Sequence, residues 1–105
     1  MTTFDDREKG FERKFAHDEE QEFKVAARRN RMLGEWAAGL MGLETVDEYA
    51  RAVVKSDFEQ PGDDDVLRKV FGDLKSAGVS VSEGEVRMKM DELLSHAREA
   101  MRSEG

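Results

Sequence analysis

The stretch FKVAARRNRMLGEWAAGL, residues 23–40, decides the fold class of this chain. Its apolar residues include Phe23, Val25, Ala26, Ala27, Met32, Leu33, Trp36, Ala37 and Leu40. Spacings of three and four dominate, and these place apolar side chains on one side of an α-helix. Gly42 follows and is a natural helix end, because glycine adopts positive φ readily. The pattern predicts a long first helix, from about Thr3 to Leu40, whose second half covers a core.

Signals of helix ends predict three further helices. Thr45-Val-Asp-Glu48 and Ser82-Glu-Gly-Glu85 each have the pattern of a capping box. Gln60-Pro61-Gly62 ends the second helix, Asp63-Asp64-Asp65 suits the positive end of the third, and Ala77-Gly78 closes the third. The expected apolar stripes are Val46, Tyr49, Ala50, Val53, Val54 and Phe58, then Val66, Leu67, Val70, Phe71 and Leu74, then Val86, Met90, Leu93, Leu94, Ala97 and Met101.

These signals together predict an all-α fold. No stretch alternates with the period of two that a strand requires. Val79 and Val81 lie in the short connector before the last helix, and we expect them to plug the core. The fold class is a four-helix bundle with a long, partly mobile N-terminal helical segment.

The whole chain is acidic and contains no cysteine. It has 105 residues, a formal net charge of −7 and a pI of about 4.9. We expect no nucleic acid among its partners, because such binding needs a basic field. Disulfides, thiolate zinc sites and cysteine nucleophiles are excluded. No apolar run approaches the 18 or so residues of a membrane span, so we expect no direct membrane insertion.

Residues 1–24 combine dense charge with aromatic side chains. Eight acidic and five basic residues surround four of the six Phe residues of the chain. On a helix, Phe4, Phe11 and Phe15 fall within about 40° of one another. So narrow a stripe buries little and is typical of a segment that docks on a partner. An extra surface helix packed on its own bundle fits the pattern equally well.

A short basic cluster, Arg28, Arg29 and Arg31, lies near Trp36 in the sequence. Guanidinium groups could contact the phosphates of a nucleotide, so these four residues are candidate nucleotide-binding residues. The alternative is a solvated helix face that pairs with the acidic residues 18–22 at helical spacing. The acidic balance of the chain favours the alternative.

No grouped catalytic residues occur in the sequence. There is no P-loop, GxGxxG or GxSxG motif, and His17-Asp18-Glu19-Glu20 matches no known metal-ligand spacing. We therefore expect no catalytic site, no metal site and no enzymatic activity.

Residues 4–43, FDDREKGFERKFAHDEEQEFKVAARRNRMLGEWAAGLMGL, resemble the signature stretch of a known family. The matching runs are Phe4-Asp5, Arg7-Glu8-Lys9, Phe11-Glu12, Lys14-Phe15-Ala16-His17-Asp18-Glu19-Glu20, Ala27-Arg28-Arg29-Asn30 and Trp36-Ala37-Ala38. They resemble the zeta subunit, the inhibitor of the F1Fo-ATP synthase in alphaproteobacteria. The resemblance continues more loosely over essentially the whole chain. Gly10 and Gly39 depart from it, since better helix formers are expected there.

The resemblance implies an inhibitor of F1-ATPase with two parts, an inhibitory segment at residues 1–22 and a helical bundle at residues 23–105. The segment would block ATP hydrolysis by inserting at the catalytic α/β interface near the rotor. The implied partners are the α, β and γ subunits, and the implied place is the cytoplasmic F1 face of the inner membrane. The expected partner-binding residues are Phe4, Asp5, Arg7, Glu8, Lys9, Phe11, Glu12, Arg13, Lys14 and Phe15.

The resemblance also implies weak binding of ATP or ADP, with no other cofactor. The alternative function is therefore an adenine-nucleotide-binding regulatory domain, with Arg28, Arg29, Arg31 and Trp36 as its site. We expect the free protein to be a monomer.

Overall fold

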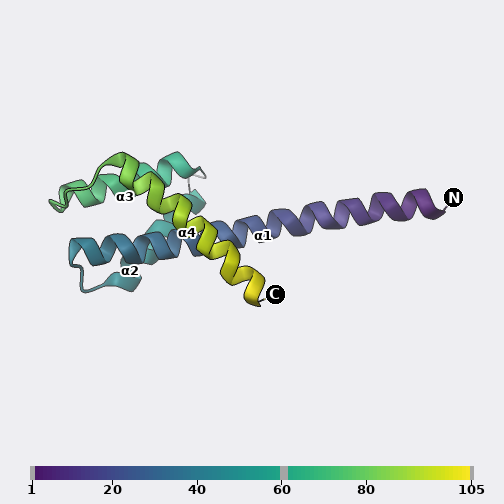
Figure 1. The fold of residues 1–105 in the computed structure, drawn as a ribbon, viewed down its shortest axis with the longest axis horizontal. Coiled ribbons are helices and arrows are strands. Elements are labelled where there is room, and N and C mark those ends of the chain that lie inside the picture. Colours follow the sequence, from purple (N-terminus) through teal and green to yellow (C-terminus); the bar gives the residue numbers. More distant parts are fainter. Residues whose placement is uncertain (1, 60–61, 105) are drawn as a thin grey trace.

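The computed structural model describes the backbone of residues 2–59 and 62–104 and the side chains of residues 21–59 and 62–103. The described chain consists of four helices: α1 (Thr2–Met41), α2 (Val46–Glu59), α3 (Asp63–Ser76) and α4 (Glu83–Glu104). Figure 1 shows α2, α3 and α4 grouped around the C-terminal half of α1. The prediction of an all-α, four-helix fold is confirmed.

Glycine ends two of the helices as the sequence predicts. Gly42 has a φ of 69° and Gly78 a φ of 79°, both in the left-handed region. After α3, the Gly78 N–H donates to the Lys75 carbonyl at 3.0 Å and the Val79 N–H donates to the Leu74 carbonyl at 3.0 Å. This Schellman pattern satisfies carbonyl groups that the helix end leaves free, and α1 ends in the same way at Gly42.

The start of α4 shows the Ser82 half of the predicted capping box. The Ser82 hydroxyl accepts a hydrogen bond from the Glu85 N–H at 3.1 Å. The Ser82 carbonyl accepts the Val86 N–H at 3.2 Å, which begins the helical ladder. Ser82 therefore fixes where the last helix starts.

One continuous core joins the four helices. Val79 and Val81 pack against this core from the connector, as expected. Its buried members are Leu33 and Ala37 of α1, Val53 of α2, Val66, Leu67, Val70 and Leu74 of α3, and Val86, Met90 and Leu93 of α4.

The first two helices approach each other closely at Gly34. An ideal Cβ built on Gly34 would lie 2.6 Å from the Ala50 Cα, which is closer than real Cβ atoms come to non-bonded heavy atoms. The absence of a side chain at residue 34 therefore sets the distance between α1 and α2.

The prediction that Phe58 belongs to the buried apolar stripe of α2 is wrong. Phe58 is 72% exposed, whereas Ala50 and Val53 are fully buried. The half-buried position near the end of α2 belongs to Asp57, which accepts hydrogen bonds from the Asn30 side chain and the Gly62 N–H. Phe58, one residue later, consequently points away from the core.

No helix among the described residues is long and apolar enough to cross a membrane.

Candidate functional site

The ten predicted partner-binding residues, from Phe4 to Phe15, have side chains outside the described part of the chain. Their backbone falls within the bounds of α1, Thr2–Met41. The assignment of these residues to partner binding therefore stays a prediction. The mobility expected for this segment likewise falls on residues whose side chains lie outside the description.

Arg29 of the basic cluster is buried, with 2% of its surface exposed. Its Nε donates to Asn30 Oδ1 at 2.9 Å, and its Nη2 donates to Asp63 Oδ1 at 2.8 Å. Asn30 is fully buried, and its Nδ2 donates to Asp57 Oδ2 at 2.8 Å. These side chains form a polar network that ties the middle of α1 to the end of α2 and the start of α3.

Arg31 lies on the surface and faces a different element. Its Nη2 donates to Asp47 Oδ1 at 2.6 Å, and its Nε donates to Glu35 Oε1 at 3.2 Å. Asp47 also pairs with Arg51 at 3.0 Å. Arg31 therefore joins α1 to the start of α2.

Trp36 packs against the core from the side of α4. Lys89 Nζ lies 5.7 Å from the centre of its ring, which is within the range of a cation–π contact. Arg28 is half-buried on α1. The structure thus directs Arg29, Arg31 and Trp36 towards α3, α2 and α4 respectively, and these three do not meet at one site.

A groove that sequence reasoning missed lies between α1 and α2. It encloses a cavity of about 300 Å³, lined by Phe23, Ala27, Asn30, Val54, Asp57 and Phe58. The rings of Phe23 and Phe58 meet edge to face, with centroids 6.3 Å apart at 75°. The sequence offers no local signal for this pair, because the two residues come from different helices.

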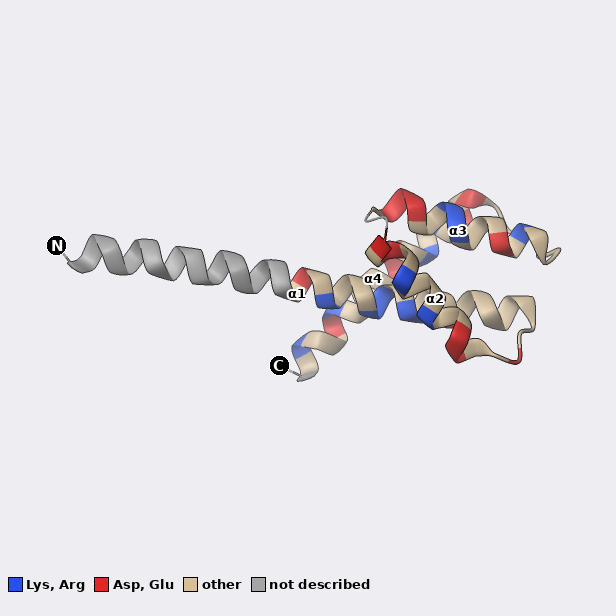
Figure 2. Cartoon of the chain, turned by 180° about the vertical axis from the view of Figure 1, so that it is seen from behind, with Lys and Arg blue, Asp and Glu red and all other residues tan. Residues whose placement is uncertain are grey.

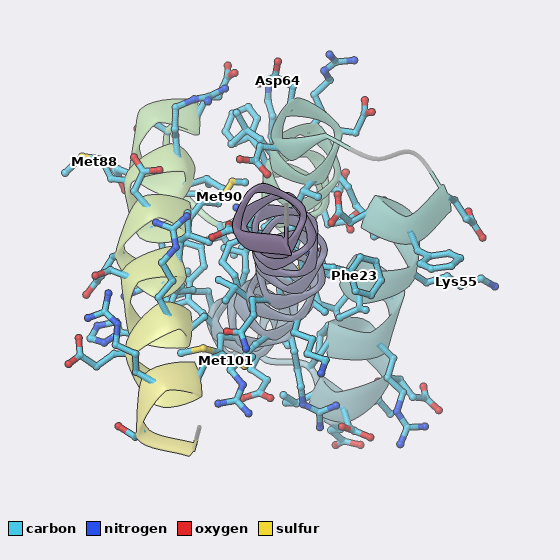
Figure 3. The ribbon with its side chains drawn as sticks, turned by 90° about the vertical axis from the view of Figure 1, so that its right-hand side faces the viewer. Phe23, Lys55, Asp64, Met88, Met90 and Met101 are labelled. Atoms are coloured by element: carbon cyan, nitrogen blue, oxygen red, sulfur yellow. The ribbon has the colours of Figure 1, made fainter. Side chains whose placement is uncertain are left out.

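Side chains of both charges lie on the helices near this groove, since Arg51 pairs with Asp47 and Lys55 with Glu59. Lys24 follows Phe23 on α1, and Lys55 and Arg51 lie about one and two turns before Phe58 on α2; all three are exposed. Figure 2 shows Lys and Arg segments along α1 where it passes the other helices. In Figure 3, Lys55 lies beyond Phe23 on the side of α2, and Met88 lies on the opposite side of α1.

Acidic residues elsewhere on the surface form structural ion pairs. Asp64 of α3 accepts from Arg87 of α4 at 2.9 Å, and this hydrogen bond and the charge of Arg87 lower the pKa of Asp64. Among the described residues, no group of three or more His, Asp or Glu side chains could hold a metal ion.

Comparison with known proteins identifies the family. The sequence model of a family described as ATPase inhibitor subunit zeta matches residues 1–100. A search among curated proteins gives no match. One solved structure, described as a solution NMR structure, is 41% identical, covers 79% of this chain and 96% of its own, and superimposes with a TM-score of 0.67. A subunit that inhibits an ATPase is a regulatory protein and not an enzyme, as the sequence predicts. The chain belongs to the ATPase inhibitor subunit zeta family.

Proposed function

We propose that this chain blocks ATP hydrolysis by inserting residues 1–22 at a catalytic α/β interface of F1. The observation that carries the proposal is the family match, which spans residues 1–100 and so includes this segment. Insertion there brings the chain next to the γ subunit, on the cytoplasmic face of the inner membrane. The catalytic interface must open and close in each cycle, so a helix wedged in it stops turnover without any chemistry by the inhibitor.

The arrangement of the helices supports a separate role for the first residues of the chain. In the described part of the chain, buried hydrophobic residues begin at Val25. The other three helices gather around the C-terminal half of α1 (Figure 1). The three helices cover the C-terminal half of α1, and this arrangement supports a separate, partner-binding role for residues 1–22.

The residue types of the segment suit a protein interface. Phe4, Phe11 and Phe15 would be the buried anchors, since aromatic side chains contribute most at interface centres. Charged side chains would pair around them at the rim, where they orient the complex. The rim residues are Asp5, Arg7, Glu8, Lys9, Glu12, Arg13 and Lys14.

The test is the inhibition of ATP hydrolysis by the cognate F1. We expect the combined Phe4→Ala, Phe11→Ala and Phe15→Ala variant to need roughly a hundredfold more protein for half-inhibition, because three anchors are lost. Removal of residues 1–18 should abolish inhibition. Met88→Ala is the matched control, because Met88 is an exposed apolar residue on α4. If the deletion variant inhibits as well as the full chain at saturating protein, the proposal is wrong.

Weak binding of ATP or ADP stays a prediction. Arg29 is engaged by Asn30 and Asp63, and Arg31 by Glu35 and Asp47, so a phosphate would have to displace acidic partners. Titration with millimolar ATP, followed by amide chemical shifts, tests it. Shifts centred on residues 28–36 would support this site, and their absence at millimolar nucleotide would remove it.

A further inference from the structure

We propose that α2 and α4 form a collar around α1 at residues 22–25, and that the side chains of this collar are positioning residues for inhibition. The collar consists of Glu22, Phe23 and Val25 of α1, Phe58 of α2, and Arg98 and Met101 of α4. The positioning role rests on the proposed function, since it assumes that the N-terminal segment inhibits F1. The collar itself is a property of the free protein.

One side of α1 is held by α4. Arg98 Nη2 donates to Glu22 Oε2 at 3.1 Å and to Glu22 Oε1 at 3.3 Å. Val25 is buried, with 4% of its surface exposed, and it lines one hollow together with Arg98 and Met101. In Figure 3, Met101 points from α4 towards α1. A charged and an apolar side chain of the same turn of α1 therefore both face α4.

Another side of α1 is held by α2. The rings of Phe23 and Phe58 lie edge to face, with centroids 6.3 Å apart at 75°. Such aromatic pairs contribute stability beyond the area that they bury. Figure 3 shows Phe23 on the α2 side of α1 and Met101 on the α4 side. The helix is thus held from two sides within residues 22–25.

The spacing of these residues explains why a short stretch contacts two helices. Successive residues of an α-helix are about 100° apart, so Glu22 and Phe23 face different neighbours. Glu22 and Val25 are three residues apart and therefore lie on one side of α1. Arg98 and Met101 have the same spacing on α4. One turn of each of these two helices is enough for this half of the collar.

A held turn of α1 matters because helix formation is limited by its first turn. Nucleation is unfavourable, whereas adding residues to an existing helix is not. The backbone of α1 runs from Thr2 to Met41, so the turn at residues 22–25 can serve as a nucleus for the residues before it. A segment that is already helical has less conformational entropy to lose on binding. The collar thereby raises the affinity of the segment for F1 without touching F1.

Hydrogen exchange in the free protein tests the collar. We expect Arg98→Glu to speed the exchange of the amides of residues 21–25 roughly two- to fivefold, the range for loss of an exposed ion pair. Glu22→Arg combined with Arg98→Glu exchanges the two charges and should restore the wild-type rate. Lys75→Glu is the matched control, because it changes the net charge equally at an exposed residue of α3. Circular dichroism checks that each variant keeps its helices.

The α2 half of the collar has its own variant. We expect Phe58→Ala to speed the exchange of residues 21–25 roughly threefold, because the edge-to-face pair is lost. Met88→Ala should not change it. Met88 is a close control, since it is 73% exposed and Phe58 is 72% exposed. If both variants exchange at the wild-type rate, Phe58 does not hold α1 and this half of the collar is wrong.

Inhibition of the cognate F1 tests the positioning role. Arg98→Glu should raise the concentration for half-inhibition roughly two- to fivefold, because the closed collar is the competent state. The exchanged charges should restore it, which a direct contact of Arg98 with F1 would not allow.

A covalent link tests whether the collar must open for inhibition. Gln21 and Arg102 both line the hollow between α1 and α4, and the chain contains no cysteine. A bifunctional thiol reagent that joins Gln21→Cys to Arg102→Cys should therefore keep the collar closed and leave inhibition intact. The same protein with each thiol capped separately is the control.

The outcomes separate the collar from the proposed function. If exchange at residues 21–25 does not respond to Arg98→Glu, or the exchanged charges fail to restore it, the collar is overturned. Restored exchange with inhibition that never changed, or loss of inhibition in the linked protein alone, overturns the positioning role. If the protein without residues 1–18 still inhibits F1, the proposed function fails, and the exchange experiment still decides the collar.

Discussion

At the scale of single residues, two glycines of α1 have opposite roles. Gly34 lies against Ala50, and a Cβ there would come within 2.6 Å of a backbone atom, which cannot rotate away. Apart from its chain neighbours and the backbone of its own helix, Gly39 has no heavy atom within 4 Å of its Cβ position. The resemblance marks Gly39 as a departure from better helix formers, and the structure shows no packing reason for glycine there.

Replacing these two glycines by alanine should change stability in opposite directions. Gly34→Ala should lower the free energy of unfolding by about 1–3 kcal/mol, because α2 must shift to admit the methyl group. Gly39→Ala should raise it by about 0.5–1 kcal/mol, because alanine has less conformational entropy to lose in a helix. Urea unfolding of both variants measures the two changes. Equal effects of the same sign would contradict the close approach at Gly34.

At the scale of helices, one tyrosine organises the contact between α2 and α3. The Tyr49 hydroxyl donates to Asp73 Oδ2 at 2.8 Å, and Lys69 pairs with the same carboxylate at 3.2 Å. Lys69 Nζ also lies 5.6 Å from the centre of the Tyr49 ring. Burial, and then the hydrogen bond to Asp73 and its negative charge, raise the pKa of Tyr49 above its ordinary value of 10.0.

The raised pKa of Tyr49 predicts how stability depends on alkaline pH. A group whose pKa is higher in the folded state contributes its stability fully below the unfolded pKa and loses it as pH rises. The free energy of unfolding should therefore start to fall above pH 10 and continue to fall towards the folded pKa of Tyr49. The chain has one tyrosine, so phenolate absorbance reports on Tyr49 alone.

Asp73→Asn separates the causes of this shift. It removes the negative charge but leaves the burial, which is the largest cause, so the pKa of Tyr49 should fall only part of the way back. If the phenolate titration of the folded wild-type protein is centred near pH 10, burial and Asp73 do not raise the pKa of Tyr49, and the prediction is wrong.

At the scale of the whole molecule, local sequence signals predict the helices well. Glycines at 42 and 78 and the serine at 82 act on their own neighbours, so the sequence alone locates these helix ends. The hydrogen bonds of Arg29 with Asp63 and of Asn30 with Asp57 join residues 34 and 27 positions apart. No local pattern contains such pairs. The sequence therefore shows a basic cluster where the structure has a buried polar network.

Local sequence patterns also fail to predict the candidate sites, because these depend on contacts between residues far apart in the sequence. The exposure of Phe58 follows from the packing of α2 on α1, and the groove beside it needs residues from both helices.

The division of the chain at residue 22 stays a prediction. The deletion of residues 1–18 also bears on it, since a separate bundle should still unfold cooperatively without them.

The close approach of α1 to α2 also restricts how this chain can evolve. A larger residue at position 34 meets the backbone at Ala50, so exchanging the side chain at 50 for a smaller one would not make room. A substitution at position 34 is therefore tolerated only if several other residues change with it and move α2. Position 39, five residues further along the same helix, is open to substitution. Among descendants of this sequence, we expect glycine to persist at 34 long after it has been replaced at 39.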